Sequence, residues 1–366
     1  MEATRVQLAQ GVYLTYLPAR KFKTSLLSAQ FVTPLRQDTA GANALLAAVL
    51  RRGTVSCPDM GALSARMDHL YDASIDYTVR KKGENQCVGF VASFIDDCYA
   101  PGGERLLEPV AELLGELVCD PVTFHGRFVP EYFDSEKTNL LEAIRSLIND
   151  KRDWADSRLL SALCAGEAYA IPRLGDEETV DKLQALKVYD QYRQMISTAP
   201  MEIIYSGSAD LERVRLALAA AFATLPREEV RAISAAEPHI GRETVQYVED
   251  AMDVTQGKLG MGFSCGSSDM PALLMGNTLF GGSSNSKLFL NVREKLSLCY
   301  YASSLYHRQK GLITVSSGIE FQNYQKAYDE IMAQLEAVQK GQLEDWELEG
   351  ARSTLLNSYA TIGDSQ

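Results

Sequence analysis

The chain has 366 residues and a formal net charge of −12, from 48 acidic and 36 basic side chains; hydrophobic residues make up 46% and charged residues 23%. These values are typical of a soluble globular protein that is long enough for two domains, each with its own core. An acidic chain without a basic block disfavours nucleic acid or an anionic membrane as the main partner. Small molecules, peptides and proteins remain as candidate ligands.

The cysteine count and the first residues indicate the compartment. Seven cysteines, an odd number without a C-x-x-C pair, suit a reducing environment better than a disulfide framework. The N-terminus MEATRVQLAQ lacks the basic start and apolar core of a signal peptide. Apolar runs such as LALAAAFA at 216–223 are far shorter than the roughly 20 residues of a membrane span. The sequence therefore predicts a cytoplasmic protein that does not insert into membranes.

Two parts of the chain repeat each other. Tyr71 in YDAS matches Tyr300 in YYAS at an offset of 229, and Gly53 matches Gly282 at the same offset. The dipeptide Lys-Gly at 82–83 recurs 228 residues later. A shared offset that covers a helix, a glycine turn, a second helix and a hairpin predicts two copies of one fold.

The expected elements follow the same order in each copy. The first copy has a strand TSLLSAQFV at 24–32, an alanine- and leucine-rich helix, a helix MGALSARMDHLY, a strand pair IDYTVRKKGENQCVGFVASF and a helix ERLLEPVAELLGELV. The second has strands ETVQYV and KLGMGF around 243–263, a helix SKLFLNVREKLSLCY, a strand pair SLYHRQKGLITVSSGI and a helix YQKAYDEIMAQLEAV. This mixture of strands and helices predicts two domains of the α+β class. Each domain is expected to be an antiparallel sheet with helices packed on one side.

The alignment of the two copies also predicts domain bounds. The first domain is expected over 1–227, a linker over 228–243, where no periodicity survives, and the second domain over 244–366. By this alignment the second copy ends before the counterpart of the first copy's last residues, so the second domain is expected to be incomplete at its C-terminal end.

The segment LFGGSSNSKLFLNVREKLSLCYYAS at 279–303 resembles the C-terminal half of the insulinase/pitrilysin family of zinc peptidases. The resemblance covers essentially the whole chain and is to the branch with subunits of about this size. It implies that Arg293 and Tyr300 hold the substrate in the active cleft and stabilise the oxyanion of hydrolysis. Their spacing of seven predicts that both lie on one helical face, two turns or about 10 Å apart.

The family's metal site is His-x-x-Glu-His on a helix of the first domain, with a later glutamate as the third ligand. The motif positions are found by counting back from Arg-Gly-Thr at 52–54. In the stretch ANALLAAVL, the ligand and general-base positions all hold alanine. The position of the third ligand also holds alanine, one step from Glu142. The corresponding positions of the second copy also lack a ligand. The resemblance therefore implies that the metal site is degenerate at Ala44, Ala47, Ala48 and Ala143. It also implies that this chain holds no metal and no cofactor.

Other candidates are less specific. The turn Gly281, Gly282 and Ser283 suits either a packed turn between helices or a loop beside bound peptide. Cys299 with His307 nearby resembles a thiol nucleophile and its base, although a buried structural cysteine is the commoner role. The four histidines are scattered without ligand-like spacing, and are expected to be ordinary surface or half-buried side chains.

Three functions compete. The resemblance favours a non-catalytic, substrate-binding subunit of a heterodimeric zinc metallopeptidase, inactive alone, which supplies Arg293 and Tyr300 while a homologous partner holds the zinc. The alternative is a pseudopeptidase that acts purely as a structural or peptide-binding scaffold. A third possibility, an independent hydrolase that uses Cys299, depends only on proximity in sequence.

Overall fold

The computed structural model describes residues 3–365, which form two compact units. The first unit comprises residues 3–145 and 171–235, and the second comprises residues 146–170 and 236–365. Each combines a mainly antiparallel sheet with helices, which confirms the predicted α+β class.

The first unit contains a six-stranded sheet of order β1-β2-β8-β3-β5-β4. All neighbouring strands are antiparallel except β2 and β8, which pair in parallel. A two-stranded ribbon, β6 with β7, stands apart from it. The strands are β1 (Thr4–Ala9), β2 (Val12–Pro18), β3 (Thr24–Pro34), β4 (Ser74–Lys82), β5 (Asn85–Ile95), β6 (Thr123–Phe124), β7 (Arg127–Phe128) and β8 (Met201–Gly207).

One face of this sheet carries the core. Phe31 of β3 lies opposite Val88 of β5, which lies opposite Val79 of β4, and all three are buried in one apolar cluster. The strands alternate apolar and polar residues, so one face meets the helices and the other is more polar. The helices of this unit are α1 (Ala40–Leu50), α2 (Met60–His69), α3 (Leu107–Cys119), α4 (Pro130–Ser146), α6 (Glu177–Asp181), α7 (Ala185–Thr198) and α8 (Leu211–Ala221).

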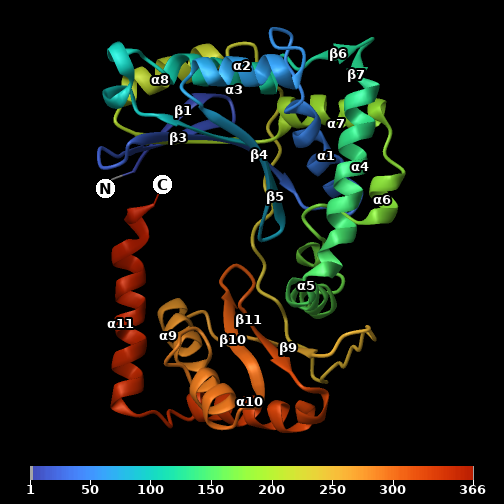
Figure 1. Ribbon diagram of the computed structural model, residues 1–366, viewed down its shortest axis with the longest axis vertical. Coiled ribbons are helices and arrows are strands. Elements are labelled where there is room, and N and C mark those ends of the chain that lie inside the picture. Colours follow the sequence, from blue (N-terminus) through green and yellow to red (C-terminus); the bar gives the residue numbers. More distant parts are fainter. Residues whose placement is uncertain (1–2, 366) are drawn as a thin grey trace. The chain divides into compact units, whose positions relative to one another are not determined.

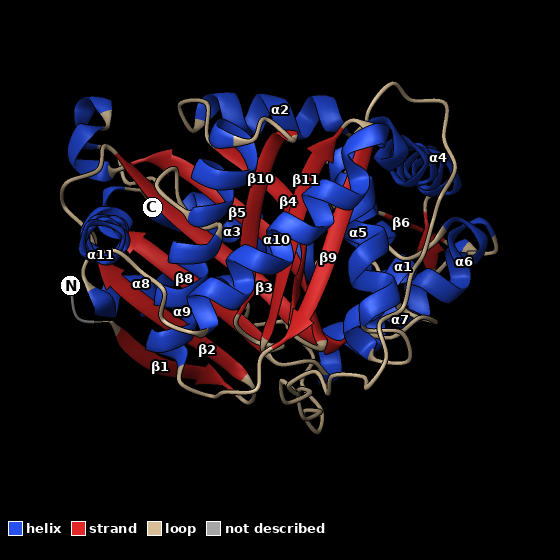
Figure 2. Cartoon of the chain, turned by 90° about the horizontal axis from the view of Figure 1, so that it is seen from below, coloured by secondary structure: helices blue, strands red, loops and turns tan. Residues whose placement is uncertain are grey.

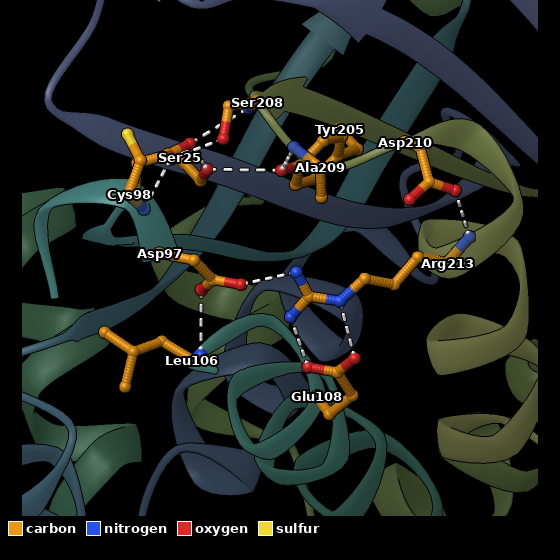
Figure 3. Close-up of polar contacts among 11 residues, drawn as sticks. Ser25, Asp97, Cys98, Leu106, Glu108, Tyr205, Ser208, Ala209, Asp210 and Arg213 are labelled. Atoms are coloured by element: carbon orange, nitrogen blue, oxygen red, sulfur yellow. Dashed lines mark hydrogen bonds and ion pairs between the residues drawn. The ribbon is translucent and has the colours of Figure 1, made fainter. Parts of the chain in front are cut away.

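Helix α1 is central to this unit because all of its residues are buried. Alanine and leucine favour the helix and present small side chains to their neighbours. Its one polar side chain, Asn43, donates to Gln86 Oε1 at 2.9 Å and accepts from Gln191 Nε2 at 2.8 Å. At another side of the unit, α3 and α8 lie side by side (Figure 1). There Arg213 of α8 lies between Asp97 and Glu108 and is ion-paired with both (Figure 3).

The second unit contains a three-stranded antiparallel sheet of order β10-β11-β9, and α10 lies across its strands (Figure 2). Ala327 and Ile331 of α10 join Val315 of β11 in the core of this unit. Its elements are α5 (Lys151–Leu163), β9 (Gly257–Ser264), α9 (Met270–Phe280), a π-helix (Leu288–Lys295), β10 (Cys299–His307), β11 (Leu312–Ile319), α10 (Tyr324–Gln339) and α11 (Asp345–Thr361).

Residues 146–170 belong to the second unit, although the predicted bounds assigned them to the first domain. The reason is the packing of α5 on β9. A Cβ atom on Gly260 would lie 3.3 Å from Leu159, and one on Gly262 would lie 2.6 Å from Leu163. The two glycines thus leave space for two leucines that are one turn apart on α5.

The internal repeat is visible in the order of elements. Each unit has a strand, two helical segments and a hairpin, and β3-β5-β4 in the first sheet corresponds to β9-β11-β10 in the second. Gly83 and Gly311 both have positive φ, 57° and 59°, at the turns of the two hairpins. The connections differ in length, because Lys82 pairs with Asn85 in the first hairpin and His307 with Leu312 in the second.

Two expected elements are wrong. The stretch ETVQYV forms no strand, and Val245, Tyr247 and Val248 are exposed without a neighbouring strand to cover them. The helix expected through Tyr300 ends at Lys295, because Ser297 has a positive φ of 49° and turns the chain into β10. Among residues 3–365, none of the helices combines the length and the apolar composition that a membrane span requires.

Candidate functional site

The degenerate metal-site positions lie beside a cavity in the first unit. Ala44 and Ala48 of α1 and Ala143 of α4 line this cavity, which has a volume of about 730 Å³. Ala47 is buried on the same helix, and is not among the lining residues. A helix repeat of 3.6 residues places positions 44 and 48 on one face, and the structure brings these two positions together with Ala143 at one cavity.

Two further elements complete the wall of the cavity. Helix α4 presents Glu136, Asn139 and Leu140, which share one helical face with Ala143. Strand β4, at the edge of the sheet, contributes residues 77–82. Arg173 and Leu174, which precede α6, lie at the same cavity.

The charges at the cavity are unequal. Glu136 is largely buried, and its Oε1 pairs with Arg52 Nη1 at 2.9 Å, so this carboxylate already has a cationic partner. Four lining residues are cationic: Arg80, Lys81, Lys82 and Arg173. Burial raises the pKa of the Tyr77 hydroxyl; Glu136 adds to this effect and Arg173 opposes it. Both charged groups therefore act on the same phenol.

The residues present do not fit a zinc ion at the expected position. Alanine has no lone pair to donate to a metal and no group that exchanges a proton, so neither ligand nor general base exists at positions 44, 47, 48 and 143. Glu136 lies on the cavity wall, but its carboxylate is bound to Arg52 and to Asn139 Nδ2 at 3.1 Å. These positions therefore cannot support a zinc-dependent hydrolytic step.

The outer edge of β4 holds two arginine side chains. Arg51 Nε donates to the carbonyl of Ile75, and Arg173 Nη1 donates to the carbonyl of Val79 at 3.4 Å. The carbonyls of Ile75 and Val79 accept hydrogen bonds from arginine side chains rather than from backbone N–H groups of β5. These two carbonyls therefore face the open edge of the sheet.

Arg293 and Tyr300 belong to the second unit and lie on different elements. Arg293 is on the π-helix, with its guanidinium 4.6 Å from the centre of the Phe289 ring and 3.6 Å from Glu294 Oε1. Tyr300 is the second residue of β10; it is 59% exposed, and its hydroxyl donates to Glu320 Oε1 at 3.4 Å. The expectation of one shared helical face is therefore wrong, while the exposure of both side chains leaves them accessible to a ligand.

The turn Gly281–Ser283 has a structural explanation at its first residue. Gly281 is buried, its carbonyl accepts from Ser304 N at 2.9 Å, and a Cβ atom there would lie 2.6 Å from the same nitrogen. Only glycine allows β10 to approach so closely. Gly282 and Ser283 are more exposed, and a role beside bound peptide stays a prediction for them.

Cys299 does not have the environment of a nucleophile. Burial raises the pKa of its thiol, although a hydrogen bond with Ser317 and the charge of Arg293 act in the other direction. His307 instead contacts Thr314 Oγ1 at 2.9 Å and the Tyr169 hydroxyl at 3.2 Å. This geometry gives no support to an independent thiol hydrolase.

One polar cluster was not expected from the sequence. Cys164, Glu167 and His239 place potential ligand atoms within 4.8 Å of one another, the one such group found among residues 3–365. His239 Nδ1 bonds to Glu167, whose other oxygen pairs with the buried Lys310 Nζ at 2.7 Å. The Lys310 ammonium thus supplies the positive charge that a metal would otherwise bring. The spacing of three between Cys164 and Glu167 was the only local signal.

Comparison with known proteins finds relatives that are described as inactive peptidases. Residues 182–355 match the family model described as peptidase M16 inactive domain. The chain is 34% identical over 361 residues to the "probable inactive metalloprotease YmfF" of Bacillus subtilis (strain 168), a match that covers 97% of this chain and 84% of that protein.

Solved structures show the same architecture. A conserved protein from Enterococcus faecalis V583 has a TM-score of 0.89 at 28% identity, with 99% of this chain and 86% of that chain covered. A peptidase M16 inactive domain from Pseudomonas fluorescens has a TM-score of 0.78 at 19% identity, with 98% and 84% covered. These structures show the fold, and the near full-length relative at 34% identity together with the matching family model establishes that the chain belongs to the M16 (insulinase/pitrilysin) peptidase family, as an inactive homologue.

Proposed function

We propose that the chain is the non-catalytic, substrate-binding subunit of a heterodimeric zinc metallopeptidase. The observation that carries the proposal is an asymmetry within one chain. The zinc-ligand positions are alanines on the wall of a cavity, while Arg293 and Tyr300 are present and exposed. In this proposal a homologous partner holds the zinc and the general base.

The chemistry of the two side chains suits a carbonyl oxygen that gains negative charge. Arginine offers several N–H donors and a permanent charge, and a tyrosine hydroxyl offers one donor. The contact of Tyr300 with Glu320 is long at 3.4 Å, and Arg293 has a weak 3.6 Å contact with Glu294. Neither side chain is committed to a strong internal bond, so each is able to turn to a substrate.

The test is reconstitution with a zinc-bearing M16 homologue from the same organism, using an internally quenched peptide as substrate. Tyr300→Phe removes one oxyanion donor and is expected to lower kcat about a hundredfold, while Arg293→Ala also raises KM. Complex formation is measured in parallel by size-exclusion chromatography. Tyr359→Phe and Arg352→Ala, both exposed on α11, are the matched controls and should keep wild-type turnover.

A scaffold role is the second candidate, and the alanines on α1 suit it equally well. It predicts that the complex forms and that both variants cleave at the wild-type rate. A pair that binds tightly without such losses would therefore replace the proposed function with the scaffold.

A further inference from the structure

We infer that the cavity at the degenerate metal site binds a small phosphate monoester, whose phosphate meets Lys81 and Arg173 and whose apolar body covers the alanine-lined wall. The site lies entirely in the first unit. It goes beyond the proposed function, because it involves neither Arg293 nor Tyr300 and needs no zinc-bearing partner.

The cavity has the size and the apolar wall of a small-molecule site. Its volume of about 730 Å³ lies within the range of about 300–1,000 Å³ typical of ligand pockets. Three wall positions are the small residues Ala44, Ala48 and Ala143, and Leu140 and Leu174 line the same cavity. A ligand that carries an apolar body would bury this wall, whereas a bare inorganic ion would leave it uncovered.

Two cations enter the cavity from opposite walls. Lys81 Nζ, on β4, donates to the Ile171 carbonyl at 3.5 Å, and Arg173 Nη1 donates to the Val79 carbonyl of β4 at 3.4 Å. Each side chain thus reaches across to the other's segment, so both charged groups lie in the gap between β4 and residues 171–174. Both contacts are at the long limit of a hydrogen bond, and charged bonds to phosphate oxygens are shorter and stronger. An anion in this gap would therefore draw both cations to itself.

The period of β4 directs Lys81 to the helix side of the sheet. Val79 is buried in the core that includes α1, and the alternation of a strand places Tyr77 and Lys81 on the same face as Val79. Arg80 and Lys82 also line the cavity, but their positions alternate to the other face of the strand. Lys81 is therefore the cation of β4 that faces the alanines of α1.

The other polar groups of the cavity favour a dianion. Glu136, the one carboxylate among the described lining residues, pairs with Arg52 and accepts from Asn139, so its charge is already balanced. Burial raises the pKa of the Tyr77 hydroxyl and the charge of Arg173 opposes this shift, so phenol and guanidinium lie near each other. Two cations and one hydroxyl donor match the charge of nearly −2 and the three acceptor oxygens of a phosphate monoester. A carboxylate supplies only one charge and two oxygens.

The test is isothermal titration calorimetry of the full chain at pH 8, where a phosphate monoester is a dianion. The probe 1-naphthyl phosphate is expected to bind at least about tenfold more tightly than 1-naphthoate, which has the same rings and one charge. Inorganic phosphate, which lacks the apolar body, should also bind at least about tenfold more weakly than the probe. Equal affinity of the probe and either competitor would overturn the proposal, as would a probe that does not bind.

Variants locate the site. Lys81→Gln/Arg173→Gln is expected to weaken binding of 1-naphthyl phosphate about tenfold or more. Arg80→Gln/Lys82→Gln makes the same change in net charge on the other face of β4 and should alter the Kd by less than about threefold. Ala143→Trp, at an exposed position of α4, keeps every charge but fills the apolar wall, and should also weaken binding. Far-ultraviolet circular dichroism checks that each variant is folded.

Two results with these variants would contradict the site. Equal losses in the two double variants would reduce the effect to general attraction between a cationic surface and an anion. An unaltered Kd in folded Ala143→Trp would show that the probe binds outside the cavity.

Discussion

Lys287 Nζ donates to both carboxylate oxygens of Glu347, at 2.9 and 3.0 Å, with the two side chains only 10% and 7% exposed. The lysine directly precedes the π-helix and the glutamate lies in the first turn of α11. Glu347 Oε2 also accepts from Glu344 N at 2.9 Å and closes a capping box. One carboxylate thus joins two segments of the second unit and fixes where α11 begins.

Removing one member of this pair should be costly. Lys287→Met leaves a buried carboxylate without its cation, and we expect the free energy of unfolding to fall by about 3–5 kcal/mol. Lys287→Met/Glu347→Leu should recover much of that loss. Urea unfolding followed by tryptophan fluorescence checks this, because both tryptophans, Trp154 and Trp346, belong to the second unit.

A matched control separates burial from pairing. Lys340 and Glu336 form an ion pair of 2.5 Å on the surface of α10, with both side chains more than half exposed. Lys340→Met should therefore change the unfolding midpoint little. A similar loss in the two lysine variants would show that burial does not set the strength of the Lys287 pair.

Much of the fold could be predicted from local pattern. The alternation of IDYTVRKKGENQCVGFVASF predicts a hairpin, and the structure has β4 and β5 there. The pairing of β2 with β8 joins segments almost 190 residues apart in parallel, and no local periodicity encodes it. The sequence predicts a helix through Tyr300 because the turn before this residue uses Ser297 at positive φ, where a glycine would have signalled the turn.

The candidate site also combines features that the local sequence predicts with contacts that it does not predict. The alanines at positions 44, 47 and 48 are recognisable because a helical motif keeps its spacing in the sequence. Arg173 reaches the Val79 carbonyl from 94 residues away, and Lys310 reaches Glu167 from a different part of the chain. Such contacts depend on tertiary packing, so residue type alone did not indicate them.

Asp96 should make the stability of the first unit depend on pH. Its carboxylate is buried, which raises its pKa, but hydrogen bonds from Ser208 and Ser25 outweigh burial and lower the pKa to about 2. Because the folded pKa is lower than the unfolded value of about 3.9, the ionised carboxylate stabilises the folded state by about 2 kcal/mol. This stabilisation is present in full above about pH 4 and is lost as the pH falls towards 2. Figure 3 shows Ser25 and Ser208 close together at this place.

The test for Asp96 is urea unfolding followed by far-ultraviolet circular dichroism. Asp96→Asn should be about 2 kcal/mol less stable than wild type at pH 7, and this gap should narrow as the pH falls below 4. Asp190→Asn, an exposed position on α7 of the same unit, should track the wild type at every pH. A gap that stays constant from pH 7 to the acid range would contradict the assignment.

Gly281→Ala should reduce stability rather than affect peptide handling alone. The added methyl group would lie 2.6 Å from Ser304 N and 2.8 Å from Leu288 Cδ1, and displacing β10 should cost about 1–3 kcal/mol. Gly276→Ala in α9 is the control, because its added methyl group would have no neighbouring atom within 4 Å and alanine favours a helix by about 0.5–1 kcal/mol. Unfolding monitored by tryptophan fluorescence should move in opposite directions for the two variants.

The metal content of the chain should reflect the alanines of α1. After treatment with a chelator and exchange into zinc-containing buffer, the chain should retain well under one zinc per molecule at its α1 site, because Ala44, Ala47 and Ala48 offer no ligand. The Cys164–Glu167–His239 cluster is the competing location, and the Lys310 ammonium disfavours a second cation there. Plasma emission spectrometry of wild type and Cys164→Ala distinguishes the sites. Stoichiometric zinc in wild type that disappears in Cys164→Ala would assign a metal to the cluster. Zinc retained by both proteins would contradict the degenerate site and would require ligands elsewhere in the cavity. Glu136 would then be the first residue to replace.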